Sequence, residues 1–260
     1  MDIEVIRGIL IPFWGTSLGA ACVFFMGGRL NAALRQGLSG FAAGVMAAAS
    51  VWSLLLPAID QSAGLGPLAF LPAAAGFWAG VLFMLLLDRA VPHPPGGPDR
   101  DAGPDGALSR TGKLILAVTI HNLPEGMAVG VVYAGLARGQ AGVTAAGALA
   151  LALGIAIQNF PEGAIISMPL RTEGAGRGRA FACGVLSGAI EPLGALLTFW
   201  FSALAAPALP CMLAFAAGAM ICVVAEALVP ETRSGGRSSL GILAFALGFT
   251  VMMALDVALG

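Results

Sequence analysis

The sequence predicts an all-α integral membrane protein with eight transmembrane helices. Of its 260 residues, 58% are hydrophobic and only 10% are charged, and the mean hydropathy is +0.90. Soluble domains contain about 25% charged residues, so a chain this poor in charge is expected to reside in a lipid bilayer. The sequence also divides into eight apolar stretches, and two of them carry nearly the same polar motif.

Each apolar stretch is long enough to cross a membrane as a helix, which takes about 20 mainly apolar residues. Asp2 and Glu4 precede the first stretch, where a cleaved signal peptide would be basic, so this stretch is predicted to be retained. Gly and Pro occur often within the stretches, as is common in transmembrane helices. The predicted spans are 5–27, 38–57, 68–87, 114–137, 141–168, 180–203, 208–229 and 240–258.

The connections between the spans contain no second domain. The longest one, PHPPGGPDRDAGPDGALSR at 92–110, is rich in Pro, Gly and Asp and is predicted to be a flexible loop. Residues 1–260 are therefore expected to form a single transmembrane domain. The four cysteines show no CxxC pair or zinc-ribbon spacing. The net charge of −1 does not point to nucleic acid, and no nucleic-acid partner is expected.

The distribution of basic residues predicts the orientation, because Lys and Arg are concentrated in cytoplasmic loops. With the N-terminus outside, eleven of the 13 Lys and Arg residues fall on the cytoplasmic side, and only Arg7 and Arg138 fall outside. If one span were missed, every later loop would lie on the opposite side of the membrane and the bias would be lost. The bias therefore also favours eight spans. Both termini are predicted to face outward, and the 92–110 loop to face the cytoplasm.

A short motif occurs in two spans that cross the membrane in opposite directions. GFAAGVM occupies 40–46 in the second span, and AFAAGAM occupies 214–220 in the seventh. This pattern predicts an inverted repeat of helices 1–3 and 6–8 around helices 4 and 5, a common plan of membrane transporters. The alternative is that both copies are ordinary small-residue packing sequences of membrane helices.

The fourth and fifth spans carry the motifs HNLPEG and QNFPEG, which begin at His121 and Gln158. Pro124 and Pro161 each remove a backbone hydrogen bond within their helix. Positions i, i+1 and i+4 share one face of a helix. Two polar groups are therefore predicted: His121, Asn122 and Glu125 from the fourth span, and Gln158, Asn159 and Glu162 from the fifth.

Four glutamates fall within spans that contain no basic residue: Glu125, Glu162, Glu191 and Glu226. An unpaired carboxylate at the centre of a bilayer costs about 2.5–3.5 kcal/mol on insertion scales. These groups must therefore be protonated or share a cation. Carboxylates beside His, Asn and Gln form a mixed oxygen and nitrogen shell that suits a divalent transition metal.

The paired motifs resemble those of the ZIP (Zrt-, Irt-like protein) metal transporters, and the His-poor loop resembles that of the bacterial GufA-like branch. The resemblance covers essentially the whole chain. It implies a homodimer in the bacterial inner membrane that moves Zn²⁺, and also Fe²⁺, Mn²⁺, Cd²⁺ or Co²⁺, into the cytoplasm. It further implies elevator-type alternating access, in which spans 1, 4, 5 and 6 move against spans 2, 3, 7 and 8, without an organic cofactor.

The resemblance also implies two neighbouring metal sites. The first would use His121, Glu125, Gln158 and Glu162, with the Met46 thioether as a further ligand. The second would use Asn122, Asn159 and Glu191, with Glu125 and Glu162 bridging. The chain departs from the family pattern at three positions: Asn159 is Asp in some relatives, Ala225 is often His, and His93 stands alone where many members have a cluster.

Other polar residues are candidates for the pathway of the ion. Asp60 lies at the outer end of the second span, either at the entrance of the metal or as a solvated helix end. Ser53 either lines that entrance or bonds to its own backbone. Glu226 is a candidate for a group that assists the ligands or handles protons. Without the resemblance, Met46 would be interpreted as a packing residue; with it, both packing and metal ligation remain open.

Two other functions are compatible with buried glutamates. A proton-coupled carrier of another substrate would use them to shuttle protons, but it would not require the duplicated His and amide groups. An intramembrane metalloenzyme would require a catalytic motif. The HExxH signature of zinc proteases is absent, and the chain has only two histidines, so an enzyme is not expected.

Overall fold

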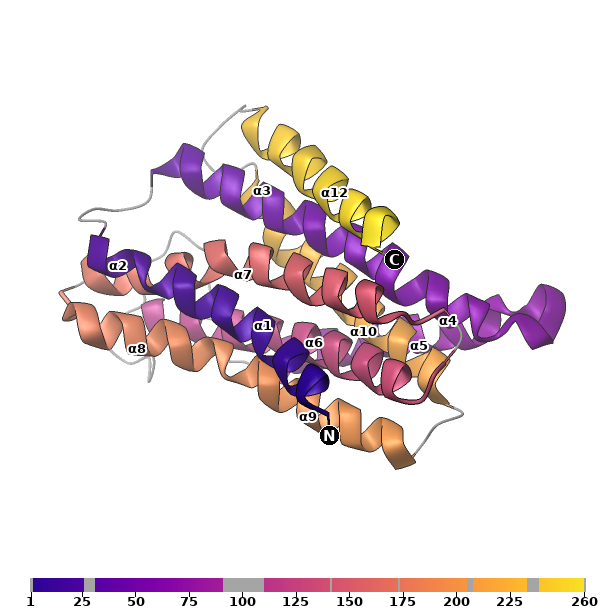
Figure 1. Cartoon of the computed structure of the whole chain (residues 1–260). Helices are drawn as coiled ribbons and strands as arrows, with labels where there is room; N and C mark the ends of the chain where they lie inside the picture. The colour runs from indigo at the N-terminus through magenta and orange to yellow at the C-terminus, as the bar shows by residue number, and fades with distance from the viewer. Residues whose placement is uncertain are drawn as a thin grey trace.

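The computed structural model describes residues 2–25, 31–90, 110–140, 142–172, 174–204, 208–232 and 239–259, and these residues form a bundle of long helices without strands (Figure 1). The predicted loop at 92–110 lies outside the described residues except for Arg110. The α-helices are α1 (Ile3–Ala20), α2 (Cys22–Phe25), α3 (Ala32–Ala49), α4 (Leu56–Asp60), α5 (Phe70–Ala90), α6 (Arg110–Ala137), α7 (Ala145–Thr172), α8 (Arg177–Gly188), α9 (Ile190–Leu204), α10 (Leu209–Val223), α11 (Val229–Glu231) and α12 (Leu240–Leu259).

Seven runs of described helix are long and apolar enough to cross a membrane. Their ends agree with the predicted spans to within about six residues: Ile3–Phe24, Ala32–Asp60, Phe70–Leu87, Ala145–Arg171, Arg177–Ser202, Leu209–Glu231 and Leu240–Leu259. The helix α6 has 28 residues and carries the first polar motif, but it is not among these seven. The prediction of a multi-pass helical protein is confirmed, and the count of eight spans stays a prediction.

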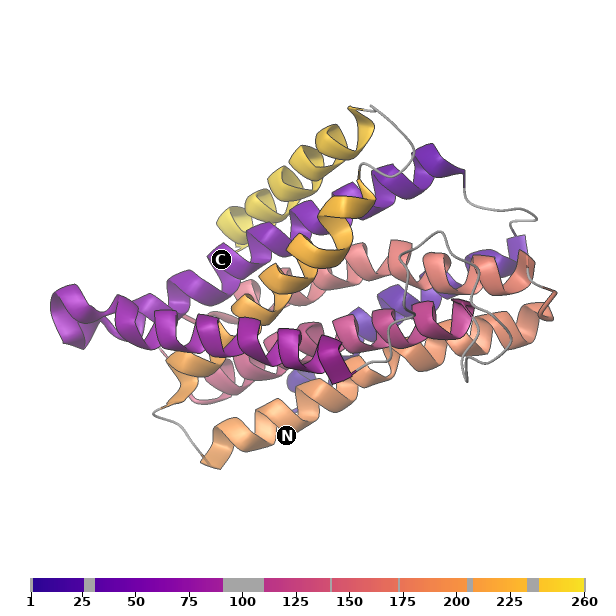
Figure 2. The same ribbon diagram turned by 180° about the vertical axis from the view of Figure 1, so that it is seen from behind.

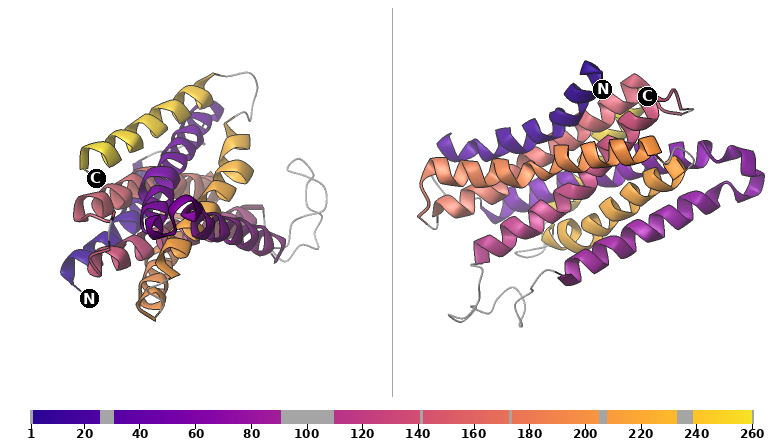
Figure 3. Two further views of the ribbon diagram at one scale, coloured as in Figure 1. Left: turned by 90° about the vertical axis from the view of Figure 1, so that its right-hand side faces the viewer. Right: turned by 90° about the horizontal axis from the view of Figure 1, so that it is seen from below.

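The helices pack most extensively in four pairs, α3 with α12, α10 with α5, α1 with α7, and α6 with α9. Figure 2 shows α12 along α3, and the right-hand view of Figure 3 shows α10 beside α5. The pairs join around one apolar core of mostly Ala, Val, Leu and Met side chains, to which Met46 belongs. The two chain ends lie on the same side of the bundle (Figure 3).

Glycine allows two of these pairs to approach to backbone contact in a reciprocal manner. In the first pair, a Cβ atom at Gly44 would overlap the main-chain oxygen of Phe245, and one at Gly248 would overlap that of Phe41. In the second pair, the corresponding overlaps are Gly80 with Phe215 and Gly218 with Phe77. All four helices thus carry the sequence Phe-x-x-Gly, and each glycine packs on the phenylalanine of its partner helix.

Two π-helical segments interrupt these helices at corresponding places. The segment η1 (Ser50–Leu55) follows α3, and η4 (Val224–Leu228) follows α10. Each begins four residues after the methionine of its AAGxM sequence, Met46 or Met220. A short helix with a proline in its first turn, Pro57 or Pro230, follows each segment. π-Helical turns are rare and occur often at functional sites. The described residues also include the 3₁₀ helix η2 (Ala63–Leu68).

We expect Gly44→Ala to destabilise the protein by about 1–3 kcal/mol, because the added methyl group has no space between α3 and α12 and both helices must shift. Thermal unfolding in detergent measures this loss. Gly178→Ala in α8 is the control, since a Cβ atom there meets open space and alanine favours a helix. Equal unfolding temperatures for the two variants would contradict the importance of this contact.

Candidate metal centre

Polar side chains from three helices gather in the interior of the bundle. They come from α6 (Asn122, Glu125), α7 (Gln158, Asn159, Glu162) and the start of α9 (Glu191). Five of them are 0% exposed, and Glu162 is 7% exposed. The structure therefore brings together six of the eight predicted metal-site residues.

The local sequence explains how the three glutamates reach the interior. Both α6 and α7 remain helical through Pro124 and Pro161, so the i, i+1, i+4 spacing holds across each motif. The run α8–α9 is instead interrupted at Ala189, just before Glu191. Pro192 contributes to this break, because it cannot donate a hydrogen bond to the carbonyl of Gly188.

The glycine that ends each motif brings a neighbouring helix close to the glutamate before it. A Cβ atom at Gly126 would overlap the main-chain oxygen of Glu191 on α9. A Cβ atom at Gly163 would overlap the main-chain oxygen of Thr16 on α1. Glycine thus allows α9 and α1 to pack directly against the two motif helices, and the third carboxylate reaches the other two.

Amide and hydroxyl groups hold one oxygen each of two carboxylates. The Gln158 Nε2 atom donates to Glu125 Oε1 at 2.7 Å. The Asn122 Nδ2 atom donates to Glu191 Oε1 at 3.2 Å, and Thr16 Oγ1 donates to the same oxygen at 2.6 Å. The Asn159 amide lies beside the carboxylates of Glu125 and Glu191. Amide groups of the two motifs therefore orient the carboxylates of Glu125 and Glu191.

Five oxygens at this centre are buried and have no hydrogen-bond partner among the described residues: Asn122 Oδ1, Glu125 Oε2, Gln158 Oε1, Glu162 Oε2 and Glu191 Oε2. A buried polar atom without a partner costs about 1–3 kcal/mol, and such atoms are scarce in folded proteins. Several unpaired oxygens in one place are the arrangement that a cation would satisfy.

The charges at the centre also favour a cation. The charged neighbours of Glu125 are Glu162 and Glu191, which repel it when ionised. No Lys or Arg occurs between 114 and 137 or between 180 and 204, so these stretches of α6, α8 and α9 supply no compensating base. Among the described residues, no three His, Cys, Asp or Glu side chains are already arranged as a metal site. A metal bound at this centre would therefore use the amide oxygens as well as the carboxylates.

For the other two predicted ligands, His121 and Met46, metal binding stays a prediction. His121 is half-buried on α6, directly before Asn122. Met46 is fully buried on α3, within the apolar core, and its main-chain carbonyl accepts a hydrogen bond from Ser50. The surroundings of Met46 are thus those of a packing residue, and its role as a metal ligand stays a prediction.

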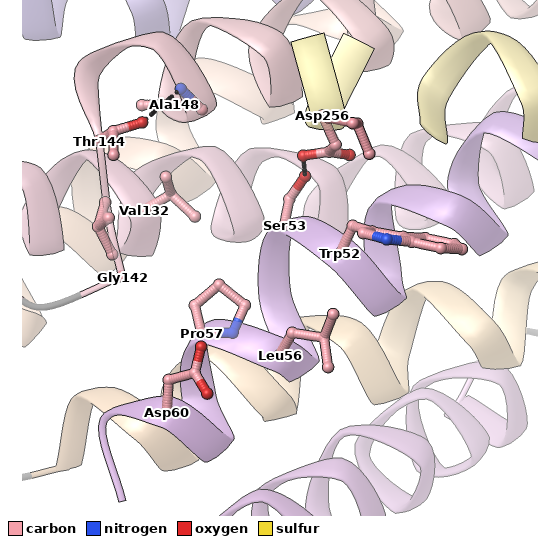
Figure 4. A pocket seen from close by; sticks show the side chains of 13 residues that line it. Trp52, Ser53, Leu56, Pro57, Asp60, Val132, Gly142, Thr144, Ala148 and Asp256 are labelled. Atoms are coloured by element: carbon pink, nitrogen blue, oxygen red, sulfur yellow. Dashed lines mark hydrogen bonds between the residues drawn. The ribbon is translucent and has the colours of Figure 1, made fainter. Parts of the chain in front are cut away.

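A separate cavity of about 220 Å³ contains the predicted pathway residues Ser53 and Asp60 (Figure 4). Residues of η1 and α4 line one side, Val132 and the start of α7 line another, and Asp256 of α12 lies opposite Ser53. The Ser53 hydroxyl donates to Asp256 Oδ1 at 2.7 Å, which corrects the alternative that it bonds to its own backbone. Asp256 Oδ2 is buried without a partner among the described residues.

The sequence analysis did not identify Asp256. Its signal was an acidic residue in the otherwise apolar last span, the same signal that identified Glu191. Glu226 lies apart from this cavity, on η4, and its side chain is exposed. It precedes Pro230 by four residues, as Ser53 precedes Pro57. Glu226 and Ser53 thus lie at the same distance from the proline that follows each π-helical segment.

Comparison with known proteins identifies the family of the chain. The sequence profile described as ZIP Zinc transporter matches residues 106–256, which include both polar motifs and Glu191. The chain belongs to the ZIP family. It is 37% identical to Zinc transporter ZIP11 of Homo sapiens, over 99% of this chain and 98% of that protein.

Two bacterial ZIP proteins are also similar. The chain is 40% identical to Zinc transporter ZIPB of Bordetella bronchiseptica, over 95% of this chain and 79% of that protein. It is 35% identical to Zinc transporter GufA of Myxococcus xanthus, over 80% and 81% of the two chains. The predicted ZIP family and its GufA-like branch are confirmed, and the family is one of transporters rather than enzymes.

We expect Glu125→Gln to stabilise the metal-free protein by about 1–3 kcal/mol, because it removes a buried charge and adds an N–H for an unpaired oxygen. Thermal unfolding with a chelator measures this gain. Zinc should stabilise the variant less than the original chain, since a ligand charge is lost.

The control is Glu231→Gln, because Glu231 pairs with Arg35 at the edge of the bundle. Loss of this partly exposed ion pair should lower the stability by at most about 1 kcal/mol. A Glu125→Gln variant that is no more stable than the original chain would contradict the proposed electrostatic cost.

Proposed function

We propose that this protein carries divalent transition-metal ions, Zn²⁺ foremost, across a bacterial inner membrane into the cytoplasm. The observation that carries this proposal is the set of five buried, unpaired oxygens on α6, α7 and α9. A cation among three carboxylates would satisfy these oxygens and remove the repulsion between the acids. The relatives named as zinc transporters support Zn²⁺ as the ion.

The proposed ion site has two parts that share carboxylates. His121, Glu125, Gln158 and Glu162, with Met46, form the first part, and the contact between Gln158 and Glu125 supports this grouping. Asn122, Asn159 and Glu191 form the second part, and the contact between Asn122 and Glu191 supports that grouping. Glu125 and Glu162 would bridge the two ions.

The ion would enter through the cavity at Ser53, Asp60 and Asp256 and leave past Glu226. Carboxylates in a cavity raise the local concentration of cations. The cavity lies where α7 and Val132 of α6 face α4 and α12. It therefore lies between the two groups of helices that would move against each other. The proposed motion carries α1, α6, α7, α8 and α9 against α3, α5, α10 and α12.

The packing within each group supports this division. Each of the four most extensive helix pairs lies inside one group and none crosses between them. The reciprocal Phe-x-x-Gly contacts and the two π-helical segments support an inverted repeat within eight spans. A pair that is locked backbone to backbone moves as one unit.

The proposed orientation has both termini outside. The start of α8, with Arg177 and Arg179, lies at one end of the bundle, and the turn after α6, with Arg138, lies at the other (Figure 1). The first end would face the cytoplasm because it is rich in Arg. A homodimer is proposed from the family resemblance alone.

A proton-coupled carrier of another substrate is the alternative within transport. It accounts for buried glutamates, but not for the unpaired amide oxygens of Asn122 and Gln158, which do not exchange protons. Metal ions account for both kinds of oxygen.

We expect Glu125→Ala and Glu162→Ala each to reduce saturable zinc uptake to background, because each removes a carboxylate that both ions would share. Radiometal uptake by purified protein in liposomes measures this, with protein insertion quantified in the same vesicles. Asp2→Ala is the control, since Asp2 is an exposed acid that makes no capping bond. Normal uptake by Glu125→Ala would locate the site elsewhere.

We expect the original chain to bind one Zn²⁺ tightly and a second weakly. Glu125, Glu162 and Glu191 supply three negative charges, so one divalent ion leaves −1 and two leave +1. A net positive charge is costly where the effective dielectric constant is low. Asn159→Asp should therefore tighten the second ion.

Equilibrium dialysis at low micromolar free zinc measures this stoichiometry. Ser17→Ala is a matched control, because Ser17 is a buried polar residue whose hydroxyl has no partner among the described residues. Two equally tight ions in the original chain, unchanged by Asn159→Asp, would show that net charge does not set the occupancy.

A further inference from the structure

Thr16 is the residue through which α1 reaches the centre. Its side chain is 0% exposed, and its Oγ1 atom donates to Glu191 Oε1 at 2.6 Å, across 175 residues of sequence. The polar motifs explain why α6 and α7 carry polar groups here. They do not explain Thr16, because α1 contributes none of the proposed metal ligands.

The acceptor of this hydrogen bond differs from the acceptors of three other buried hydroxyls in the bundle. Ser50, Thr198 and Ser202 each bond to the carbonyl four residues earlier in their own helix. Back-bonding of this kind is the usual state of Ser and Thr within helices. The Thr16 hydroxyl bonds instead to a carboxylate on another helix. The Thr16 hydroxyl can therefore fix the orientation of the Glu191 carboxylate.

Two glycines leave space for the Thr16 side chain and backbone. A Cβ atom at Gly188 would lie 2.8 Å from Thr16 Cβ and 3.2 Å from Glu191 Oε1. A Cβ atom at Gly163 would overlap the main-chain oxygen of Thr16. Thr16 is thus held between α7 and the end of α8 at a fixed distance from Glu191.

The contact makes the two oxygens of Glu191 unequal. Oε1 accepts from both Thr16 and Asn122, whereas Oε2 is buried and has no partner among the described residues. An oxygen with two donors is a poor candidate for a metal ligand, so Glu191 presents a single free oxygen.

We propose that Thr16 is a positioning residue that holds Glu191 as a one-oxygen ligand and thereby determines metal specificity. The proposal rests on the proposed function. Zn²⁺ takes about four ligands and needs one oxygen from a carboxylate. Larger ions take more oxygens and bind carboxylates through both. Thr16 therefore favours Zn²⁺ over Cd²⁺, an ion nearly as large as Ca²⁺, at the second ion position.

The test compares Zn²⁺ and Cd²⁺ affinity by equilibrium dialysis of the purified full-length protein. Thr16→Val removes the hydroxyl and keeps the shape of the side chain. Loss of a group that orients a metal ligand typically lowers affinity about 10–100-fold. We expect Zn²⁺ affinity at the second position to fall about tenfold or more and Cd²⁺ affinity to fall less, so that the Cd²⁺ to Zn²⁺ affinity ratio rises.

Thr16→Ser keeps the hydroxyl and should retain the original ratio, which a purely structural role of Thr16 would not predict. Ser17→Ala removes the neighbouring hydroxyl, which has no partner among the described residues, and should also leave the ratio unchanged. Thr16→Ala is a second variant without the hydroxyl and should raise the ratio as Thr16→Val does. Thermal unfolding verifies that each variant is folded.

An unchanged affinity ratio in both Thr16→Val and Thr16→Ala would overturn the inference, as would a Thr16→Ser variant that matches Thr16→Val. These outcomes are distinct from failure of the proposed function. If the original chain bound no Zn²⁺, the metal site itself would be wrong. If it bound Zn²⁺ and the ratio did not respond to Thr16, only the specificity role would be wrong.

Discussion

Three carboxylates buried together without a basic partner are the constraint on which the structure depends. Each ionised carboxylate costs about 2.5–3.5 kcal/mol at the centre of a bilayer on insertion scales, and neighbouring ones repel. Amide and hydroxyl donors satisfy Oε1 of Glu125 and of Glu191, but Oε2 of each has no partner among the described residues. The fold is therefore less stable than one with an apolar interior, and the binding of a cation can recover that free energy.

The same short motif provides both the buried carboxylates and the packing that brings them together. In Pro-Glu-Gly, the glutamate faces the interior, and the glycine admits the backbone of the next helix. Gly126 admits α9, which contributes Glu191, and Gly163 admits α1, which contributes Thr16. A side chain at either glycine would separate the helices and the carboxylates at once. The Phe-x-x-Gly contacts use the same principle in the other four helices, where small residues allow close packing in membranes.

Much of the fold was predictable from the sequence, because hydropathy and helical periodicity are local properties. The ends of the seven spans follow from apolar stretches, and the grouping of Glu125 with Asn122 follows from the spacing on one helix. Contacts between helices are not local. The bonds of Thr16 to Glu191 and of Ser53 to Asp256 join residues 175 and 203 positions apart. No periodicity within one helix predicts either contact, so Thr16 and Asp256 escaped the sequence analysis.

A transport site must bind its ion and also release it, and the oxygens at the proposed metal centre differ in how strongly they would bind. The centre offers carboxylate oxygens, which bind strongly, together with neutral amide oxygens of Asn122 and Gln158, which bind less strongly. A shell made only of carboxylates would hold a divalent ion more firmly and slow its release. The hydrogen bond from Gln158 further reduces the number of carboxylate oxygens that are free. The neutral amides of Asn122 and Gln158 would therefore limit how tightly this centre holds an ion, which is the property that separates a carrier from a storage site.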